Sequence, residues 1–222
     1  MYKDLQLAIF DMDGILVSSE HVYANGWQHA LKMLNLENIV PKENLFYMRG
    51  ASSASNMETI DRYVKDWSIT QQVKKARDQF FIDELNAGHV PLLPYAIELL
   101  TYLQNKADVQ LVLASNTPTS RGQLILDRYD LAKYFDHIIM GDHVKNLKPA
   151  PDIYLKALEL AQVSADKAVI FEDSLAGATA GLLAAVDILL IPEEPLPDEA
   201  IAKNDKIIAV LNSLADALPY VE

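Results

Sequence analysis

The 222-residue sequence contains no cysteine. Disulfide bonds and metal sites built from thiolates are therefore excluded, and the chain has to fold without such cross-links. Half of its residues are apolar, which suffices for one large domain or for a domain that carries a smaller insertion. The absence of cysteine fits a reducing compartment, and we expect a cytoplasmic protein.

The sequence also lacks a long uninterrupted apolar run. Its first residues, Met1 to Leu5, do not show the charged and then apolar order of a signal peptide. The most apolar stretch, Ala176 to Ile191, is interrupted by Thr179 and Asp187 and is followed by Pro192. This pattern favours a packed helix that leads into a buried strand, so no membrane association is expected.

Positive charge is scarce as well. Lysine and arginine total 19, against 31 aspartate and glutamate residues, and the formal net charge is −12. A chain with this charge repels polyphosphate backbones, so nucleic acid is not an expected partner. A small anionic substrate could still bind where a metal ion and a few well-placed cations attract it locally.

What the sequence does contain is a regular alternation of short apolar runs and amphipathic helical patterns. Five runs predict buried strands: Leu5 to Phe10, Val109 to Ala114, His137 to Met140, Ala168 to Phe171, and Ile188 to Ile191. Strands and helices in alternation predict an α/β fold, a doubly wound, Rossmann-like parallel sheet covered by helices on both faces. Ligands of such sheets bind beyond the carboxyl ends of the strands.

One part of the chain departs from this alternation. Between Leu16 and about Val90 the spacing of apolar residues is helical and no strand is expected. We therefore predict an all-helical cap domain over residues 17–91, inserted into a core domain made of residues 1–16 and 92–222. The stretch from Gly88 to Pro94 would be the return linker, and Trp27 and Trp67 are expected inside the cap.

The first predicted strand ends in Asp11-Met12-Asp13-Gly14. Because side chains alternate along a strand, carboxylates two residues apart point the same way, and the glycine lets the backbone turn sharply out of the sheet. Aspartate and glycine are also common in ordinary turns, so this tetrapeptide alone does not define a reaction centre.

Polar residues also follow the second and third strands. Ser115 and Asn116 offer a hydroxyl and an amide, although such residues often only cap a helix. In the segment from Asn146 to Asp152, two prolines hold Lys148 in a stiff, non-helical loop, and Asp152 is placed to cap the next helix. A solvated lysine is the simpler interpretation of Lys148 taken alone.

The fourth strand ends in Glu172 and Asp173. Two adjacent carboxylates behind an apolar strand are costly to bury unless a cation or hydrogen-bond donors receive them. All four polar segments project onto one edge of the predicted sheet. Their combination therefore predicts a reaction centre there, which none of them predicts alone.

Together the four segments resemble the four motifs of the haloacid dehalogenase-like hydrolases, in particular the branch with a helical cap after the first strand. That branch contains small-molecule phosphatases and β-phosphoglucomutase. The resemblance covers the chain from Leu5 to about Pro192. It implies a phosphatase that hydrolyses a small phosphorylated metabolite, such as a sugar phosphate, through an aspartyl-phosphate intermediate. We expect a monomer or a weak dimer.

The resemblance also assigns roles to individual residues. Asp11 would be the nucleophile and Asp13 the general acid and base. The phosphate would be held by Ser115, Asn116 and Lys148. The cofactor would be Mg2+, bound by Asp11, Asp13 and Asp173, with Glu172 in support. Asp13 must keep its side chain off the metal to carry a proton, so only its backbone carbonyl is expected to bind there.

Two alternative functions remain open. In the β-phosphoglucomutase pattern a histidine follows the nucleophile and a cap arginine grips a second phosphate, whereas this sequence has Tyr23 and Ser53 at those places. Hydrolysis is therefore favoured over a phosphohexomutase reaction. The other alternative is a binding protein that has kept the fold and lost turnover. Transport ATPases would need threonine in place of Asp13, and the halide-removing members need neither this second aspartate nor magnesium.

The cap and its linkers hold the remaining candidate positions. Possible substrate contacts in the cap are Tyr23, Arg49, Ser52 and Ser53. The family commonly has aspartate where Ser18 stands and glycine where Tyr95 stands, so we expect altered hinge behaviour rather than lost activity. Ser18 or Ser19 would cap the first cap helix.

Overall fold

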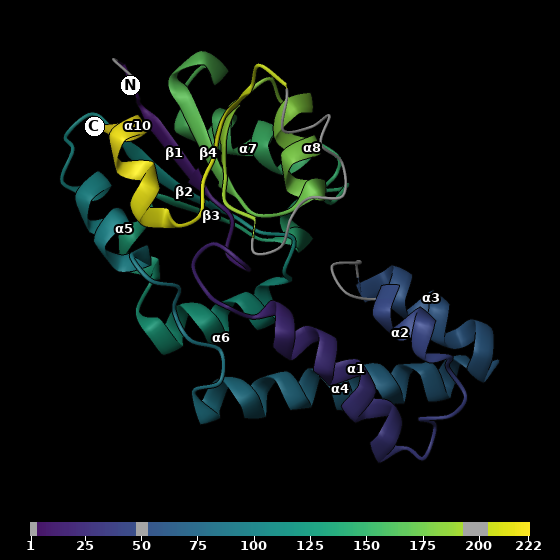
Figure 1. The fold of residues 1–222 in the computed structure, drawn as a ribbon. Coiled ribbons are helices and arrows are strands. Elements are labelled where there is room, and N and C mark those ends of the chain that lie inside the picture. Colours follow the sequence, from purple (N-terminus) through teal and green to yellow (C-terminus); the bar gives the residue numbers. More distant parts are fainter. Residues whose placement is uncertain (1–3, 48–52, 193–203) are drawn as a thin grey trace. The chain divides into compact units, whose positions relative to one another are not determined.

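The computed structural model describes residues 4–47, 53–192 and 204–222 (Figure 1). The chain forms two compact units, one made of Met1–Val17 and Leu92–Glu222 and the other of Ser18–Pro91. Val17, at the predicted boundary, belongs to the larger unit, where it forms isolated β-bridges with Asp13 and Leu92.

The larger unit is built on a sheet of six parallel strands. They are β1 (Leu7–Phe10), β2 (Gln110–Ala114), β3 (His137–Ile139), β4 (Ala168–Glu172), β5 (Asp187–Leu190) and β6 (Ile207–Val210). The strand order is β3-β2-β1-β4-β5-β6, so β1 lies in the middle between β2 and β4. This confirms the predicted fold class. The edge strand β6 was not predicted, because a short apolar run of this kind does not distinguish a strand from a helix.

Helices connect the strands and cover both faces of the sheet. The longer ones are α5 (Ala96–Gln104), α6 (Thr119–Tyr129), α7 (Asp152–Ala161) and α8 (Leu175–Leu183). Shorter ones are η1 (Ala132–Tyr134), η2 (Gly141–His143), η3 (Ala165–Lys167), η4 (Leu214–Ala217) and α10 (Leu218–Val221). Figure 1 shows α5 and α10 on one side of the sheet and α7 and α8 on the other. In the part of the chain that the structure describes, no helix is long and apolar enough to cross a membrane.

The central strands are buried on both faces, which explains why they are apolar throughout. Leu7 and Ile9 of β1 join a buried cluster with residues of α7 and α8. On the opposite face, Phe10 stacks on Phe171 of β4, with ring centroids 4.2 Å apart. Side chains of a strand alternate between the faces, so a strand covered on both sides has no polar positions to interrupt its apolar run.

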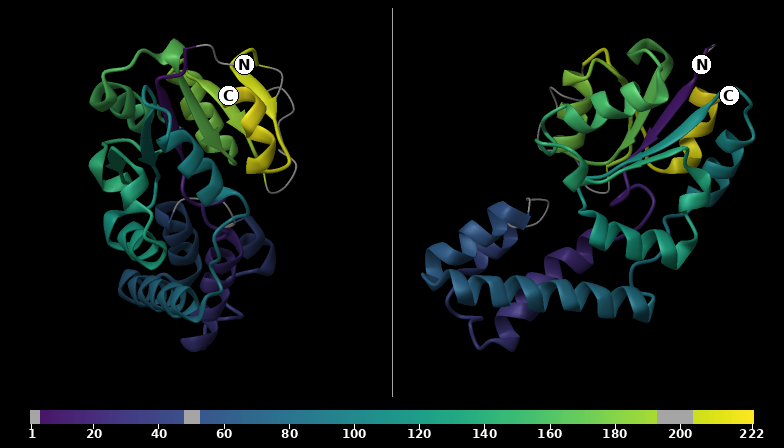
Figure 2. Two further views of the ribbon diagram at one scale, coloured as in Figure 1. Left: turned by 90° about the vertical axis from the view of Figure 1, so that its left-hand side faces the viewer. Right: turned by 180° about the vertical axis from the view of Figure 1, so that it is seen from behind.

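The smaller unit, residues 18–91, is the helical cap. Its helices are α1 (Glu20–Met33), α2 (Lys42–Tyr47), α3 (Ser53–Val64) and α4 (Trp67–Ala87), shown in two further views in Figure 2. Trp27 of α1 packs in its core with residues of α3 and α4. The expectation that Trp67 is buried was wrong. Trp67 is 50% exposed because it begins α4, where Asp66 caps the helix by accepting hydrogen bonds from two backbone N–H groups.

A buried arginine joins the two long helices of the cap. Arg77 of α4 is only 4% exposed, and its guanidinium lies 5.0 Å from the ring centroid of Tyr23 and 4.9 Å from that of Trp27, both on α1. The Tyr23 ring also stacks on Phe81, at a centroid distance of 4.9 Å. Arg77 Nη1 donates to Asp78 over 2.7 Å. The arginine thus combines a packing role with cation–π contacts in the cap interior.

We expect Arg77→Met to destabilise the protein by about 1–3 kcal/mol, because methionine fills part of the space but makes neither the cation–π contacts nor the ion pair. The midpoint of urea unfolding, followed by the fluorescence of the tryptophans, measures this change. Lys75→Met is the matched control on the exposed face of the same helix and should leave the midpoint unchanged. Equal midpoints for the two variants would show that Arg77 is not a structural element of the cap.

The two linkers between the units are hydrogen-bonded to each other. Leu93 N donates to Leu16 O over 2.8 Å, and Ser18 N donates to Pro91 O over 2.9 Å. Ser19 occupies the N-cap position of α1, but its side chain makes no capping hydrogen bond, so it does not act as the expected serine cap. The return linker begins where predicted, since Gly88 ends α4 with a left-handed φ of 84°.

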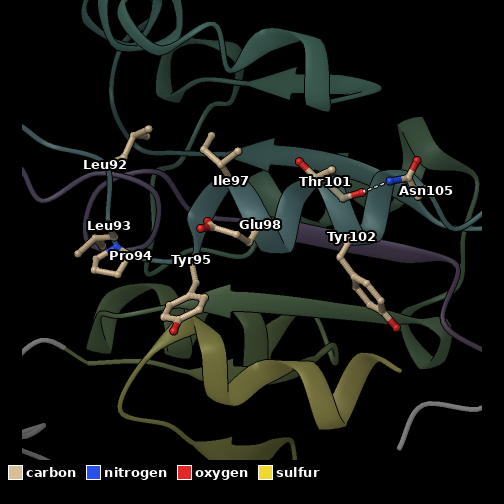
Figure 3. A pocket seen from close by; sticks show the side chains of 9 residues that line it. All are labelled: Leu92, Leu93, Pro94, Tyr95, Ile97, Glu98, Thr101, Tyr102 and Asn105. Atoms are coloured by element: carbon tan, nitrogen blue, oxygen red, sulfur yellow. Dashed lines mark hydrogen bonds between the residues drawn. The ribbon is translucent and has the colours of Figure 1, made fainter.

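Tyr95 follows the return linker and holds an unusual backbone conformation. Its φ is 66°, in the left-handed region that favours glycine, and it forms the N-cap position of α5. Tyr95 lines a pocket of about 700 Å³. Figure 3 shows the side chains around this pocket. The pocket is lined by Leu92, Leu93, Pro94, Tyr95, Ile97, Glu98, Thr101, Tyr102 and Asn105. None of these is a predicted catalytic, phosphate-binding or metal-binding residue.

Candidate active site

The polar residues that follow the strands meet at the carboxyl edge of the sheet. Lys148 Nζ lies 2.7 Å from Asp11 Oδ1 and 2.8 Å from Glu172 Oε2. The carboxylates of Asp11, Glu172 and Asp173 each offer an oxygen, and these oxygens lie within 4.8 Å of one another. The side chains that the sequence analysis expected to converge from distant segments are therefore close together in space.

The turn after β1 has to carry a glycine. Gly14 has a φ of 81°, and a Cβ added to it would overlap the carboxylate of Asp173. The glycine therefore serves two needs, the left-handed backbone of the turn and the close approach of the acidic side chain from the end of β4. Asp11 is held at the start of this turn by its backbone N–H, which donates to Phe171 O over 3.0 Å.

The loop that carries Lys148 is fixed by side-chain amides and carboxylates. Asn116 Oδ1 accepts from Lys148 N over 2.9 Å, and Asn116 Nδ2 donates to Lys148 O over 3.2 Å. Asn116 was predicted to bind phosphate, and in the structure its side chain holds the lysine loop. Asp152 does not cap α7, because it is the first residue of that helix. Its Oδ1 instead accepts from the backbone and the side chain of Asn146, which ties the two ends of the loop together.

Lys148 is a buried cation rather than a solvated lysine. It is 8% exposed, and its ammonium sits between two carboxylates. Burial lowers the pKa of Lys148, but the charges of Asp11 and Glu172 outweigh this and raise it well above its usual value. The lysine therefore stays protonated and supplies a fixed positive charge at this edge of the sheet.

Glu172 is fully buried and surrounded by donors. Its Oε2 accepts from Lys148 and from the hydroxyl of Tyr154, at 2.8 and 2.6 Å. Its Oε1 accepts from the hydroxyl of Ser174 over 2.8 Å and from the backbone N–H groups of Asp173 and Ser174, each over 3.1 Å. Burial raises the pKa of Glu172, but Lys148 and these hydrogen bonds lower it to about 2. A Cβ on Gly177 would overlap this carboxylate.

Tyr154 is a member of the site that the sequence analysis missed. It lies on the buried face of α7, where it was hidden among aliphatic residues, and Lys148 Nζ is 4.8 Å from its ring centroid. Burial raises the pKa of Tyr154 well above its usual value, so the hydroxyl acts as a donor to Glu172. A tyrosine in an otherwise aliphatic helix face is itself a signal, because a buried hydroxyl requires a partner.

We expect Tyr154→Phe to destabilise the protein by about 1.5–3 kcal/mol, because it removes a hydrogen bond to a buried, ionised carboxylate without changing the packing. Urea unfolding at neutral pH measures the change. Tyr95→Phe removes a hydroxyl from a half-exposed ring and should leave the unfolding midpoint where it is. A Tyr154→Phe midpoint equal to that of the unaltered protein would mean that Glu172 does not depend on this donor.

The positive charge of Lys148 does not fully compensate the burial of an ionised Asp11. Burial raises the pKa of Asp11 to about 8, and the charges of Glu172 and Asp13 add to this shift, while Lys148 opposes it. Among the residues that the structure describes, Asp11 and Glu172 share one ammonium, that of Lys148. An additional cation would stabilise the ionised form of Asp11. Closely spaced carboxylate oxygens without imidazole or thiolate are the donor set that suits a hard divalent cation such as Mg2+.

Asp13 and Ser115 lie in the same unit and share one neighbour. Asp13 is not a member of the acidic group, and its Oδ2 accepts from the hydroxyl of Thr117 over 2.7 Å. Ser115 is buried, and its Oγ accepts from the backbone N–H of Thr117 over 3.1 Å. Since the Ser115 oxygen already accepts, its own proton is available for donation to a ligand. Thr117 was also missed by the sequence analysis.

The expected cap contacts are largely beyond what the structure describes. Arg49 and Ser52 lie outside the described residues, as does the side chain of Ser53. Tyr23 is described, and its ring packs against Phe81 and Arg77 within the cap. Both contacts lie in the cap interior, so the described role of Tyr23 is packing within the cap.

These features define a class of enzyme. The sequence model of the haloacid dehalogenase-like hydrolases matches residues 8–191, and the chain belongs to this family. Within it, the chain is similar to the phosphorylated carbohydrates phosphatase of Thermotoga maritima, with 30% identity over 195 residues, 82% of this chain and 83% of the relative. It is also similar to the phosphoglycolate phosphatase of Aquifex aeolicus, with 29% identity over 178 residues and 80% of each chain.

A solved structure shows the same fold. The structure of CbbY from Rhodobacter sphaeroides in complex with phosphate is similar with a TM-score of 0.78, 24% identity and coverage of 96% of both chains. The relatives thus confirm the predicted family, the α/β core with its helical cap, and the enzyme class of the phosphoric monoester hydrolases.

Proposed function

We propose that this protein is a magnesium-dependent phosphatase that hydrolyses a small phosphorylated metabolite through an aspartyl phosphate on Asp11. The observation that carries the proposal is the buried Lys148, bonded to both Asp11 and Glu172 at the carboxyl edge of the sheet. The names of the two relatives, which act on phosphorylated carbohydrates and on phosphoglycolate, support a small organic phosphate as the substrate.

The site can hold a phosphate monoester next to Asp11. Such an ester is an anion that repels a carboxylate, so its charge has to be balanced before attack. Lys148 provides a fixed cation 2.7 Å from the attacking carboxylate, and the Ser115 hydroxyl provides a donor. Asn116 contributes indirectly, because it fixes the backbone of Lys148. The negative field of a chain with net charge −12 is thereby offset at one place.

The reaction proceeds in two steps. An ionised Asp11 oxygen attacks phosphorus, the bond from phosphorus to the ester oxygen breaks, and Asp13 gives its proton to the departing alkoxide. Water then attacks the phosphorus of the aspartyl phosphate and passes a proton to Asp13. The bond between phosphorus and Asp11 breaks, phosphate leaves, and both aspartates return to their first states.

The acidic group fits the cofactor that the family implies. Asp11 and Asp173 would hold Mg2+, together with the backbone carbonyl of Asp13, and Glu172 would support them while bonded to Lys148. When bound, Mg2+ neutralises charge on the substrate and favours the ionised form of Asp11. The position of the Asp13 side chain supports its separate role, because it bonds to Thr117 and is not part of the acidic group.

Release of phosphate from p-nitrophenyl phosphate and from a panel of sugar phosphates, phosphoglycolate and glycerol phosphates tests the proposal. We expect steady turnover that requires Mg2+ and stops when EDTA is added. Binding of phosphate without turnover would instead support a protein that has kept the fold and lost activity. Conversion of β-glucose 1-phosphate to glucose 6-phosphate with a bisphosphate primer, faster than phosphate release, would support the phosphohexomutase alternative.

A further inference from the structure

Thr117 is bonded to two predicted site residues, Ser115 and Asp13. It follows β2 by three residues, and its backbone is fixed on both sides. Thr117 N donates to Ser115 Oγ over 3.1 Å, and Thr117 O accepts from Gly141 N over 2.9 Å. The residue is 4% exposed. The backbone of Thr117 is therefore held by residues just beyond β2 and β3, one of which, Ser115, the proposed function assigns to phosphate binding.

The hydroxyl of Thr117 has a defined direction. Thr117 Oγ1 donates to Asp13 Oδ2 over 2.7 Å. Arg121, near the start of α6, donates from Nη2 to the same Oγ1 over 3.5 Å. A guanidinium can only donate, so the threonine oxygen faces Arg121 as an acceptor. The hydroxyl proton is then directed away from Arg121 and toward Asp13.

We propose that Thr117 is the positioning residue for Asp13, because its buried hydroxyl holds the Asp13 carboxyl in the orientation from which that carboxyl serves the departing ester oxygen. A hydrogen bond to a carboxylate is short and strong enough to fix the orientation of the group. The inference rests on the proposed function, in which Asp13 is the general acid and base.

A misplaced general acid affects esters unequally. Protonation of the departing oxygen raises the rate most when that oxygen is strongly basic, and it raises the rate little when the leaving group is a stable anion. Phenyl phosphate and p-nitrophenyl phosphate have nearly the same shape, but p-nitrophenolate is the far better leaving group. The kcat/KM value covers the steps up to departure of the phenol, so the ratio of kcat/KM for the two esters reports the acid role separately from the later attack of water.

The experiment compares Thr117→Val, Thr117→Ser and Thr119→Val on both esters with saturating Mg2+. Thr117→Val should lower kcat/KM for phenyl phosphate by at least about 10-fold and that for p-nitrophenyl phosphate by less than about 3-fold, with the loss in kcat rather than KM. Thr117→Ser keeps the hydroxyl and should restore the ratio. Thr119 is the matched control, because its hydroxyl also donates to an aspartate, Asp142, over 2.7 Å. Thr119→Val should leave the ratio unchanged.

Each outcome decides a different question. An equal loss on both esters in Thr117→Val, or a rise in KM with unchanged kcat, would overturn the positioning role while leaving the phosphatase proposal intact. No turnover of either ester by the unaltered protein would overturn both. Should Thr117→Val fail to fold, Arg121→Gln keeps the threonine and removes the donor that directs it. Arg121→Gln should also lower kcat/KM more for phenyl phosphate than for p-nitrophenyl phosphate, but by a smaller factor than Thr117→Val. An equal loss on the two esters in Arg121→Gln would also overturn the inference.

Discussion

The Asp11→Asn protein is expected to be folded and inactive, with kcat lowered by at least about three orders of magnitude. An amide oxygen is a poor nucleophile, and neither Glu172 nor Asp13 is placed to take over. Glu172 is bonded to Lys148, Tyr154 and Ser174, and Asp13 is turned toward Thr117. Phosphate release from p-nitrophenyl phosphate measures the loss, and circular dichroism shows whether the fold is retained.

The same substitution should not destabilise the metal-free protein. Burial raises the pKa of Asp11 to about 8, so an ionised carboxylate at this place is unfavourable without another cation. Asparagine removes that charge and leaves Lys148 paired with Glu172. We expect a thermal midpoint in EDTA at least equal to that of the unaltered protein, and a smaller upward shift on adding Mg2+.

Asp127→Asn is the control, because Asp127 lies on the exposed side of α6 and accepts only from Gln123 among the bonds described. It should change neither activity nor the response to Mg2+. Turnover retained by Asp11→Asn would remove Asp11 from the role of nucleophile. A response to Mg2+ equal to that of the unaltered protein would instead show that the metal does not bind near Asp11.

The parts of the site that follow strands could be predicted because a parallel sheet imposes their convergence. Asp11, Lys148 and Glu172 come from segments up to 161 residues apart. Asp11 and Glu172 stand at strand ends and Lys148 stands in the loop that follows β3, and parallel strands end at one edge. The roles of Thr117 and Tyr154 could not be read in this way. They depend on which side chain faces which partner, and sequence periodicity gives only the buried face.

Some local predictions failed for similar reasons. Asp152 has the residue type and the place of a helix cap, but its carboxylate bonds to Asn146 across the loop. Trp67 has helical spacing with buried residues, but a helix start exposes it. In both cases the pattern identified the element and missed the contact, because several partners compete for one polar or apolar side chain and tertiary geometry decides among them.

The largest loss of stability is expected for Lys148→Met. Methionine fills the space of the lysine stem but leaves Asp11 and Glu172 buried side by side without their shared ammonium. Removing one partner of a buried ion pair typically costs about 3–5 kcal/mol, since the remaining charge has no compensation. Activity should fall at the same time, because the phosphate loses its fixed cation. Urea unfolding in EDTA and phosphate release with Mg2+ measure the two effects.

A second substitution separates these two effects. Lys148→Met combined with Glu172→Gln removes the uncompensated charge of Glu172 while the amide keeps most of the hydrogen-bonding shape of that side chain. We expect the double variant to be more stable than Lys148→Met and still inactive, since stability depends on charge balance and turnover on the cation itself. Lys145→Met, an exposed lysine three residues earlier in the same loop, should behave like the unaltered protein. If Lys148→Met unfolds at the same urea concentration as Lys145→Met, the buried pairs do not stabilise the site, and the charge balance inferred for Asp11 is wrong.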